Sequence, residues 1–339
     1  MQDQNGGKSK IDRIRESAGI MTVGDDSDGA MVSMVTIDGR LFAIKEGAVY
    51  AISLADDIDP QRTREDIPNT VQKIFNVGSK SELVQRLLLT AAELFRKDRL
   101  QEHVNYEAAL SVVLEIMRDV VAATEIFEEF EAALKQVRAK TLTAKQRGLS
   151  LPSVPGLPSQ VKSFVQKMDH AIQSVFNLAC VFYGEATLRK SGKWLDGLTN
   201  HLEAPQDAKG EFLPFSKELA DLGKLIRNVR HCIEHPKPKQ QLRITDFSLN
   251  VNAQLVEPTI AVIHDTTPLD TAPIQEFMRF FLEQVVVGAE MLMVFLASHH
   301  IAPVGGFPVG VGEIPLTQRR LGVRYGYLIN MGGQVARLG

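Results

Sequence analysis

The side chains best suited to chemistry gather in one short segment, residues 227 to 236, which reads Arg-Asn-Val-Arg-His-Cys-Ile-Glu-His-Pro. Guanidinium groups bind phosphate oxygens through paired hydrogen bonds, and imidazoles exchange protons near neutral pH. Cleavage of RNA uses both abilities. The 2′-hydroxyl of RNA is an internal nucleophile, so the enzyme supplies a proton acceptor, a proton donor and charge stabilisation at the phosphate. The segment therefore predicts phosphodiester chemistry.

This segment is expected to close an amphipathic helix that begins near residue 215. At about 100° per residue, apolar side chains fill one arc of the helix and polar side chains fill the other. The apolar arc contains Leu222, Leu225, Ile226, Val229, Cys232 and Ile233. The polar arc contains Arg227, Asn228, Arg230, His231, Glu234 and His235. We expect the helix to bury the first arc and to present the second.

The spacing of Arg230 and His235 resembles the R-x(4 to 6)-H motif of the HEPN family (higher eukaryotes and prokaryotes nucleotide-binding). The polar residue His231 follows the arginine, as the family's pattern prefers, and Pro236 follows the second histidine. The resemblance covers residues 158 to 298 and implies a small, often dimeric helical bundle. Many members are metal-independent ribonucleases of toxin, abortive-infection and other defence systems, in which the arginine and histidine line a cleft at the dimer interface.

The resemblance implies that Arg230 and His235 are the catalytic pair. His235 would act as general base or acid, and Arg230 would hold the charge that develops on the phosphoryl oxygens. The family's more usual Arg-Asn opening is matched by Arg227 and Asn228, but the spacing after Arg227 leads to Cys232 instead of a histidine. Which arginine is functional therefore stays open.

The remaining polar residues are expected to support this pair. His231 could contact phosphate or orient Arg230, and Glu234 could pair with Arg230 or Arg227 across one turn. Asn228 could bond backbone or base. On the preceding helix, four residues are further candidates to face the site: Asp169, His170, Tyr183 and Glu185.

No cofactor or metal is expected. The chain has no HExxH motif, no paired cysteine motif and no convincing cluster of carboxylates. Two functions therefore remain open. One is a metal-independent endoribonuclease of toxin or phage-defence type that cleaves RNA by 2′-hydroxyl transphosphorylation. The other is a catalytically inactive HEPN-like module that binds a nucleotide or a partner protein.

Composition restricts the partners. The net charge of −3 excludes a protein that coats nucleic acid by bulk charge, but residues 221 to 243 hold six Lys or Arg against two Asp or Glu. RNA or nucleotide contact is therefore expected to be local to the motif helix, in a homodimer. Residues 285 to 296 are apolar but short for a membrane span, and the N-terminus lacks the apolar run of a signal peptide. These features predict a cytoplasmic protein with no membrane contact.

The predicted fold class is mainly α. Residues 1–29 read as a flexible polar tail, and residues 30–150 as a small antiparallel β-meander of three strands followed by long helices at 79–97 and 105–140. Residues 151–300 read as the HEPN-like helical bundle with a β-hairpin inserted at 242–263, and residues 301–339 as a C-terminal extension, in which the glycine-rich residues 304–312 read as a flexible tail. The β-meander could act as a sensor for the bundle, which leaves room for a regulatory partner protein.

Overall fold

The computed structural model describes residues 9–17, 21–138, 144–145, 148–203, 210–305, 308–331 and 334–338. About 50% of the chain is helical and 21% is strand. The strands form one four-stranded, two three-stranded and two two-stranded sheets. The prediction of a mainly α fold is therefore wrong. The chain is mixed, because segments on both sides of the last helix pair into sheets of their own.

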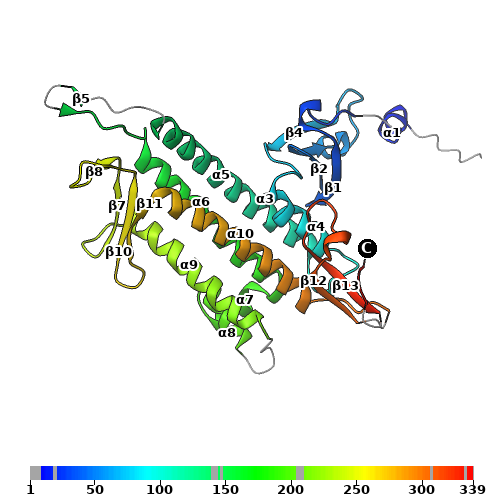
Figure 1. Cartoon of the computed structure of the whole chain (residues 1–339). Coiled ribbons are helices and arrows are strands. Elements are labelled where there is room, and N and C mark those ends of the chain that lie inside the picture. Colours follow the sequence, from blue (N-terminus) through cyan, green and yellow to red (C-terminus); the bar gives the residue numbers. More distant parts are fainter. Residues whose placement is uncertain are drawn as a thin grey trace, which may run out of the picture.

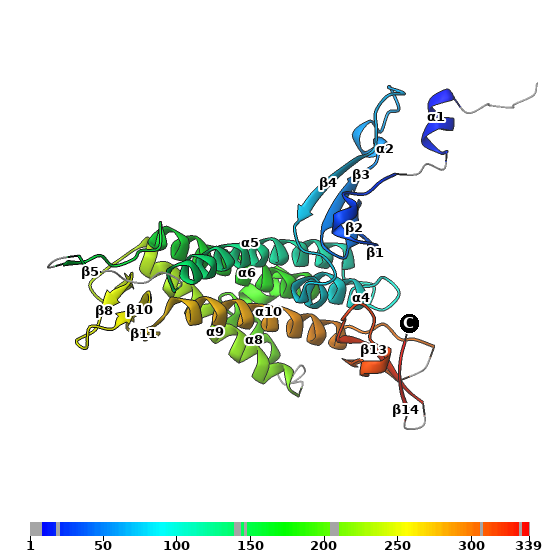
Figure 2. The ribbon, with the colours of Figure 1, turned by 45° about the horizontal axis from the view of Figure 1, so that its top comes forward.

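Four long helices run side by side and form the centre of the molecule (Figures 1 and 2). Each carries an apolar stripe at helical spacing, and these stripes pack together into one continuous core. In α6, for example, Phe164, Met168 and Ile172 are all buried. The four helices are α5 (Tyr106–Arg138), α6 (Leu157–Tyr183), α9 (Phe212–Glu234) and α10 (Ile274–His299). Their positions agree closely with the helical periodicity of the sequence.

Helix α10 is long and apolar enough to cross a membrane by length and composition, and 61% of its most apolar window is buried inside the protein. The helix is thus longer than the apolar segment recognised in the sequence. It also carries a carboxylate in the core, Glu290, whose side chain is 1% exposed. Arg86 and Arg324 both pair with this carboxylate. A buried carboxylate needs such partners, because an isolated buried charge is costly.

The N-terminal β region lies at one end of the helices (Figure 2). It has four antiparallel strands, one more than the predicted meander, because a strand after the loop at residues 59–69 joins its edge. The strands are β1 (Met31–Ile37), β2 (Arg40–Lys45), β3 (Val49–Ser53) and β4 (Thr70–Phe75). The expected Asp-Gly turn is present, with positive φ at both Asp38 and Gly39.

Three short helices accompany this sheet. They are α1 (Lys10–Arg15), a 3-10 turn (Asp26–Asp28) and α2 (Ala55–Ile58). The first two lie within the segment expected to be a flexible tail, and α1 begins with a capping box at Ser9. Arg62 joins α1 to α2 through Asp12 and Asp56, at 2.7 and 2.9 Å. The described part of the expected tail is therefore structured.

The predicted helix at residues 79–97 is shorter and irregular. It consists of α3 (Glu82–Val84), a π-helical segment (Gln85–Leu89) and α4 (Thr90–Leu94). The Thr90 hydroxyl donates to the carbonyl of Gln85 at 2.8 Å. Side-chain competition for a backbone carbonyl is one way in which a helix departs from regular pairing.

The region between α9 and α10 forms a three-stranded antiparallel sheet where a two-stranded hairpin was expected. Its strand order is β11-β10-β7, and it lies at the opposite end of the helices from the N-terminal sheet (Figure 1). The strands are β7 (Gln240–Thr245), β10 (Thr259–His264) and β11 (Leu269–Pro273). Two further pairs are short: β8 (Ser248–Leu249) with β9 (Leu255–Val256), and β5 (Ala144–Lys145) with β6 (Gly148–Leu149).

The C-terminal segment forms a packed sheet. The flexible tail expected at residues 304–312 is wrong for residues 309–312, which lie in the first strand of this sheet. Its strands are β12 (Val309–Glu313), β13 (Tyr325–Met331) and β14 (Gln334–Arg337), with a 3-10 turn at Leu316–Gln318. The buried Tyr327 donates its hydroxyl to the carbonyl of Leu94 at 2.7 Å. Arg337 pairs with Glu93 at 2.6 Å. The sheet is therefore attached to α4, and Arg324 attaches it to α10.

Candidate functional site

Helix α9 buries the apolar arc predicted from its sequence, but it does not leave the opposite arc freely exposed. Ile226, Val229 and Cys232 are buried. On the polar arc, His235 is exposed at the C-cap, while the other members are half-buried. They are half-buried because residues of other elements contact this arc: Asp169 of α6, Trp194 of the segment before residue 195, and Gln240 of β7. The site is thus a set of contacts between elements and not a bare polar face.

Arg230 is held by two carboxylates. Its Nη1 donates to Oδ2 of Asp169 on α6, and its Nε lies 3.0 Å from Oε1 of Glu234 one turn along α9. Asp169 has no exposed side-chain surface, and Arg230 is 27% exposed. Glu234 therefore pairs with Arg230, and Asp169 faces the motif helix from α6.

This pairing changes the electrostatics of both partners on α9. The hydrogen bond from Arg230 lowers the pKa of Glu234 below its ordinary value. The bond to Glu234, followed by that to Asp169, raises the pKa of Arg230. Gln173 also donates to Asp169 Oδ2, at 2.6 Å. The positive charge of Arg230 is thus compensated inside the protein, and little of it is available to a phosphate.

Arg227 has a different environment, although it lies less than one turn before Arg230. Its guanidinium carbon lies 3.5 Å from the centroid of the Trp194 ring, in a cation–π contact. Its Nη1 is buried and has no hydrogen-bond partner among the described residues. No carboxylate of the described residues forms an ion pair with it. Arg227 therefore keeps both a free positive charge and a free donor.

Arg227, His231 and His235 follow one another at intervals of four residues, so they form one strip along α9. We call these three residues the cationic strip, after the positive charge of Arg227. The imidazole centroids of His231 and His235 are 6.3 Å apart. Burial lowers the pKa of His231, and the positive charge of Arg227 lowers it further. His231 is therefore favoured as a neutral imidazole that can accept a proton.

Two contacts fix the end of α9 against the neighbouring sheet. Asn228 donates to the hydroxyl of Thr267 at 3.2 Å, so its side chain is used inside the protein. Gln240 donates through Nε2 to the carbonyls of His231 and His235, at 3.1 and 2.9 Å. These carbonyls belong to the end of the helix, where backbone acceptors lack intrahelical partners. The last turn, which carries both histidines, is thereby held in place.

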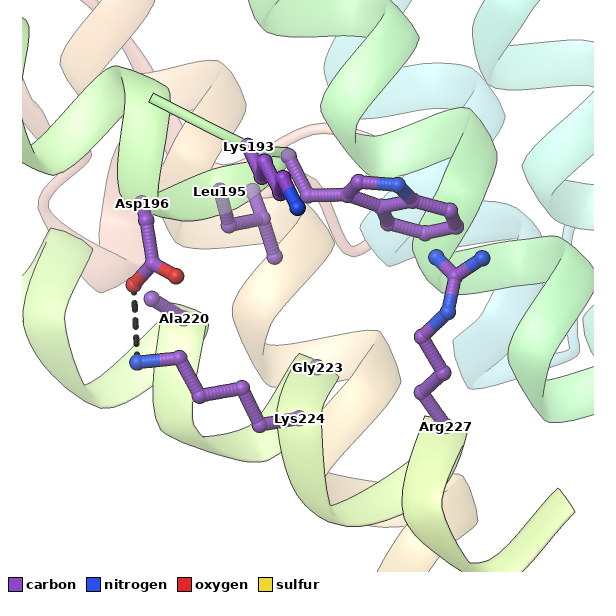
Figure 3. A pocket seen from close by; sticks show the side chains of 8 residues that line it. Lys193, Leu195, Asp196, Ala220, Gly223, Lys224 and Arg227 are labelled. Atoms are coloured by element: carbon purple, nitrogen blue, oxygen red, sulfur yellow. Dashed lines mark ion pairs between the residues drawn. The ribbon is translucent and has the colours of Figure 1, made fainter. Parts of the chain in front are cut away.

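A pocket of about 330 Å³ lies beside the strip (Figure 3). It is formed between α9 and the start of α8 (Leu195–Leu202), which follows α7 (Glu185–Ser191). Gly223, Lys224 and Arg227 line it from α9. Lys224 pairs with Asp196 at 2.7 Å across the pocket. The lining residues are Lys193, Trp194, Leu195, Asp196, Ala220, Gly223, Lys224 and Arg227.

Trp194 has φ of 56° and ψ of −139°, a conformation that is strained for a residue other than glycine. Such strain costs on the order of 1–3 kcal/mol and is often found at ligand-binding positions. Stacking against Arg227 and, at 6.4 Å between centroids, against Phe176 holds the ring in place. Residues 192 to 210, which include Trp194, are mostly polar in the sequence and gave no sign of this role. The apolar spacing of Leu195, Leu198 and Leu202 was the signal for the short helix behind it.

Other residues proposed for the site lie elsewhere. His170 faces α5, where Asp119 lies 4.0 Å away. Tyr183 packs its ring against His201 and His300, and Glu185 pairs with Arg189 at 2.6 Å. Within the part of the chain that the structure describes, no three His, Cys, Asp or Glu side chains are grouped as metal ligands. The site therefore consists of α9, Asp169 of α6 and the α7–α8 connection.

Comparison of the chain with protein-family models, with curated proteins and with solved structures finds no match.

Proposed function

We propose that this chain is a HEPN-like protein that binds RNA, and that the cationic strip of α9 contacts the phosphates. The observation that carries the proposal is the contrast between the two arginines of the motif. Arg230 forms ion pairs with Asp169 and Glu234, whereas Arg227 stacks on Trp194 and forms no ion pair with a carboxylate of the described residues. Phosphate binding requires an available cation, so Arg227 is the better phosphate contact.

This proposal reassigns the roles inferred from the motif. Arg230 becomes a positioning residue that fixes α9 against α6, and Arg227 and His231 become the residues that meet the RNA backbone. His235 extends the strip at its exposed end. Binding is expected to be local to this face, in keeping with the overall net charge of −3.

The direct test is binding of a fluorescein-labelled single-stranded RNA, followed by fluorescence anisotropy. RNA should bind saturably, and the affinity should fall as salt rises, because phosphate contacts release counterions. Absence of binding at low salt would refute the proposal. Lys190 on α7 provides a matched control, since it is an exposed cation of the same neighbourhood outside the strip. Lys190→Gln should bind RNA like the unchanged protein.

A second candidate function is metal-independent RNA cleavage of the toxin or phage-defence kind. The observation that favours it is the lowered pKa of His231 beside the guanidinium of Arg227 and one turn from the exposed His235. Two imidazoles one helical turn apart can accept the proton of a 2′-hydroxyl and donate a proton to the leaving oxygen.

Cleavage is tested by incubating RNA with the protein in excess EDTA and identifying the product ends. The proposed mechanism gives 2′,3′-cyclic phosphate or 3′-phosphate ends. His231→Ala and His235→Ala should each lower the rate by about 100-fold or more, the usual contribution of an acid or base. Activity that EDTA abolishes and magnesium restores would contradict the mechanism. RNA binding without cleavage would support the binding function and exclude the cleavage function.

A further inference from the structure

The pocket between α8 and α9 has the charge of an anion site. Lys193, Lys224 and Arg227 line it, and Asp196 is its one acidic lining residue. Lys224 is compensated by carboxylates, so the available positive charge of the pocket rests on Lys193 and Arg227. The Lys224 ammonium lies 2.7 Å from Asp196 and 3.5 Å from Asp221, and these ion pairs hold it at the edge of the pocket. An anion entering here would meet cations from both elements.

The pocket also offers apolar surface. Leu195, Ala220 and Gly223 line it, together with Trp194, between the cations. A Cβ on Gly223 would lie 3.0 Å from the Leu195 side chain, so a larger residue would crowd this floor. A ligand that combines a compact anion with a flat, less polar body would match both parts. The pocket volume of about 330 Å³ suits a ligand of a few ring systems at most.

Arg227 links this pocket to the cationic strip. Its guanidinium lies against Trp194 on the pocket's border, and its Nη1 donor has no partner among the described residues. A buried donor without an acceptor is costly, and an anion in the pocket would remove that cost. The backbone strain at Trp194 lies at the same point. Three independent features thus converge on one cavity: excess positive charge, an unsatisfied donor and a strained aromatic residue.

We propose that the pocket binds the terminal phosphate monoester of an RNA strand together with its nucleoside. This inference rests on the proposed RNA-binding function, since it names the part of the RNA that enters the pocket. A terminal monoester carries a charge of about −1.5 to −2 near neutral pH, whereas an internal phosphodiester carries one negative charge. Lys193 and Arg227 are the two lining cations without an ion pair to a described carboxylate, and together they match the charge of the monoester. The strip would then contact the phosphates that follow.

The chain contains one tryptophan, Trp194, so its fluorescence reports on this pocket directly. Four probes are titrated: inorganic phosphate, adenosine 5′-monophosphate, adenosine 3′-monophosphate and adenosine. Both monophosphates should change the fluorescence saturably, phosphate should do so more weakly, and adenosine should not. Stronger binding of the 3′- or the 5′-monophosphate identifies which end of the strand enters. Adenosine acting as well as the monophosphates, or no saturable change with any probe, would overturn the inference.

Amino-acid substitutions distinguish specific binding in the pocket from long-range electrostatic attraction to the protein surface. Lys193→Gln and Lys224→Gln should each weaken monophosphate binding by about tenfold, because each removes a charge-assisted contact. Lys190→Gln removes an exposed cation outside the pocket and should leave it unchanged. Equal weakening in all three variants would show that only long-range charge matters, and would refute a specific pocket.

Unphosphorylated RNA, with hydroxyls at both ends, distinguishes the two proposals. If it binds in the anisotropy assay while monophosphates leave Trp194 unaffected, RNA binding stands and the pocket assignment falls. If monophosphates bind while no RNA does, the assignment of the ligand as an RNA end is wrong, and the RNA-binding function falls with it. Support for both requires that RNA carrying a terminal phosphate bind more tightly than the unphosphorylated strand.

Discussion

Arg230 on α9 donates a hydrogen bond to Asp169 on α6, a carboxylate whose side chain has no exposed surface. This contact crosses between two of the four central helices. It explains why an arginine inside a chemically suggestive motif need not face a substrate. On the same helix, Arg227 has no carboxylate partner among the described residues, so the two arginines lie in different electrostatic environments.

Removal of the Arg230 side chain should destabilise the fold. In Arg230→Ala, Asp169 stays buried without its counter-ion, which costs about 3–5 kcal/mol of unfolding free energy. Urea denaturation measures this loss. His235→Ala is the control, since truncation of an exposed side chain changes stability by about 0.5 kcal/mol or less. A loss below about 1 kcal/mol in Arg230→Ala would mean that the contact behaves as a surface ion pair.

The pKa of His231 should lie below 6.5 and should rise when the charge of Arg227 is removed. Burial is the larger cause of the lowering and will persist, so Arg227→Gln should recover part of the shift. NMR titration of the imidazole signals measures both values. Lys190→Gln should leave the His231 titration in place. An unchanged pKa in Arg227→Gln would show that the two side chains are farther apart in solution.

The same shift makes stability depend on pH. Unfolded His231 takes up a proton as the pH falls through 6.5, while folded His231 resists protonation until the pH is lower. The contribution of this residue is therefore fully present above pH 6.5 and is lost as the pH falls toward its folded pKa. In His231→Gln, denaturation midpoints should decline less over this interval. If the midpoints of His231→Gln declined as much as those of the unchanged protein, His231 would not be the cause of the pH dependence.

A homodimer is expected from the resemblance to the HEPN family, because a two-fold axis beside α9 would bring two sets of strip residues together. Light scattering at micromolar concentration should give twice the chain mass of 37.5 kDa. A monomer that retains full RNA affinity would show that one strip suffices and would remove the dimer from the account.

The sequence predicted the long helices well because their apolar stripes are continuous. It failed where pairing depends on distant residues. Strand β4 (Thr70–Phe75) joins the N-terminal sheet across an intervening loop, and the glycines in β12 (Val309–Glu313) suggested a flexible tail. Such strands form because a partner strand and a helical surface are available, and neither is visible in local composition.

The site was predicted in part. Its position at the end of α9 followed from periodicity, but the choice between Arg230 and Arg227 depends on Asp169, which lies 61 positions away in the sequence. Spacing within one helix cannot show which arginine faces a buried carboxylate on another. The role of Trp194 was likewise hidden, because its contact with Arg227 joins two elements that only the fold brings together.

The central claim is that RNA phosphate meets Arg227 and not Arg230. It is tested most directly by the salt dependence of RNA affinity in Arg227→Gln and Arg230→Lys, both checked for folding by circular dichroism. Arg227→Gln should bind about tenfold more weakly, with a salt slope reduced by about 1, as for loss of one phosphate contact. Arg230→Lys keeps a cation beside Asp169 and should bind with the unchanged slope. The account is contradicted if Arg230→Lys loses affinity and slope while Arg227→Gln binds RNA normally.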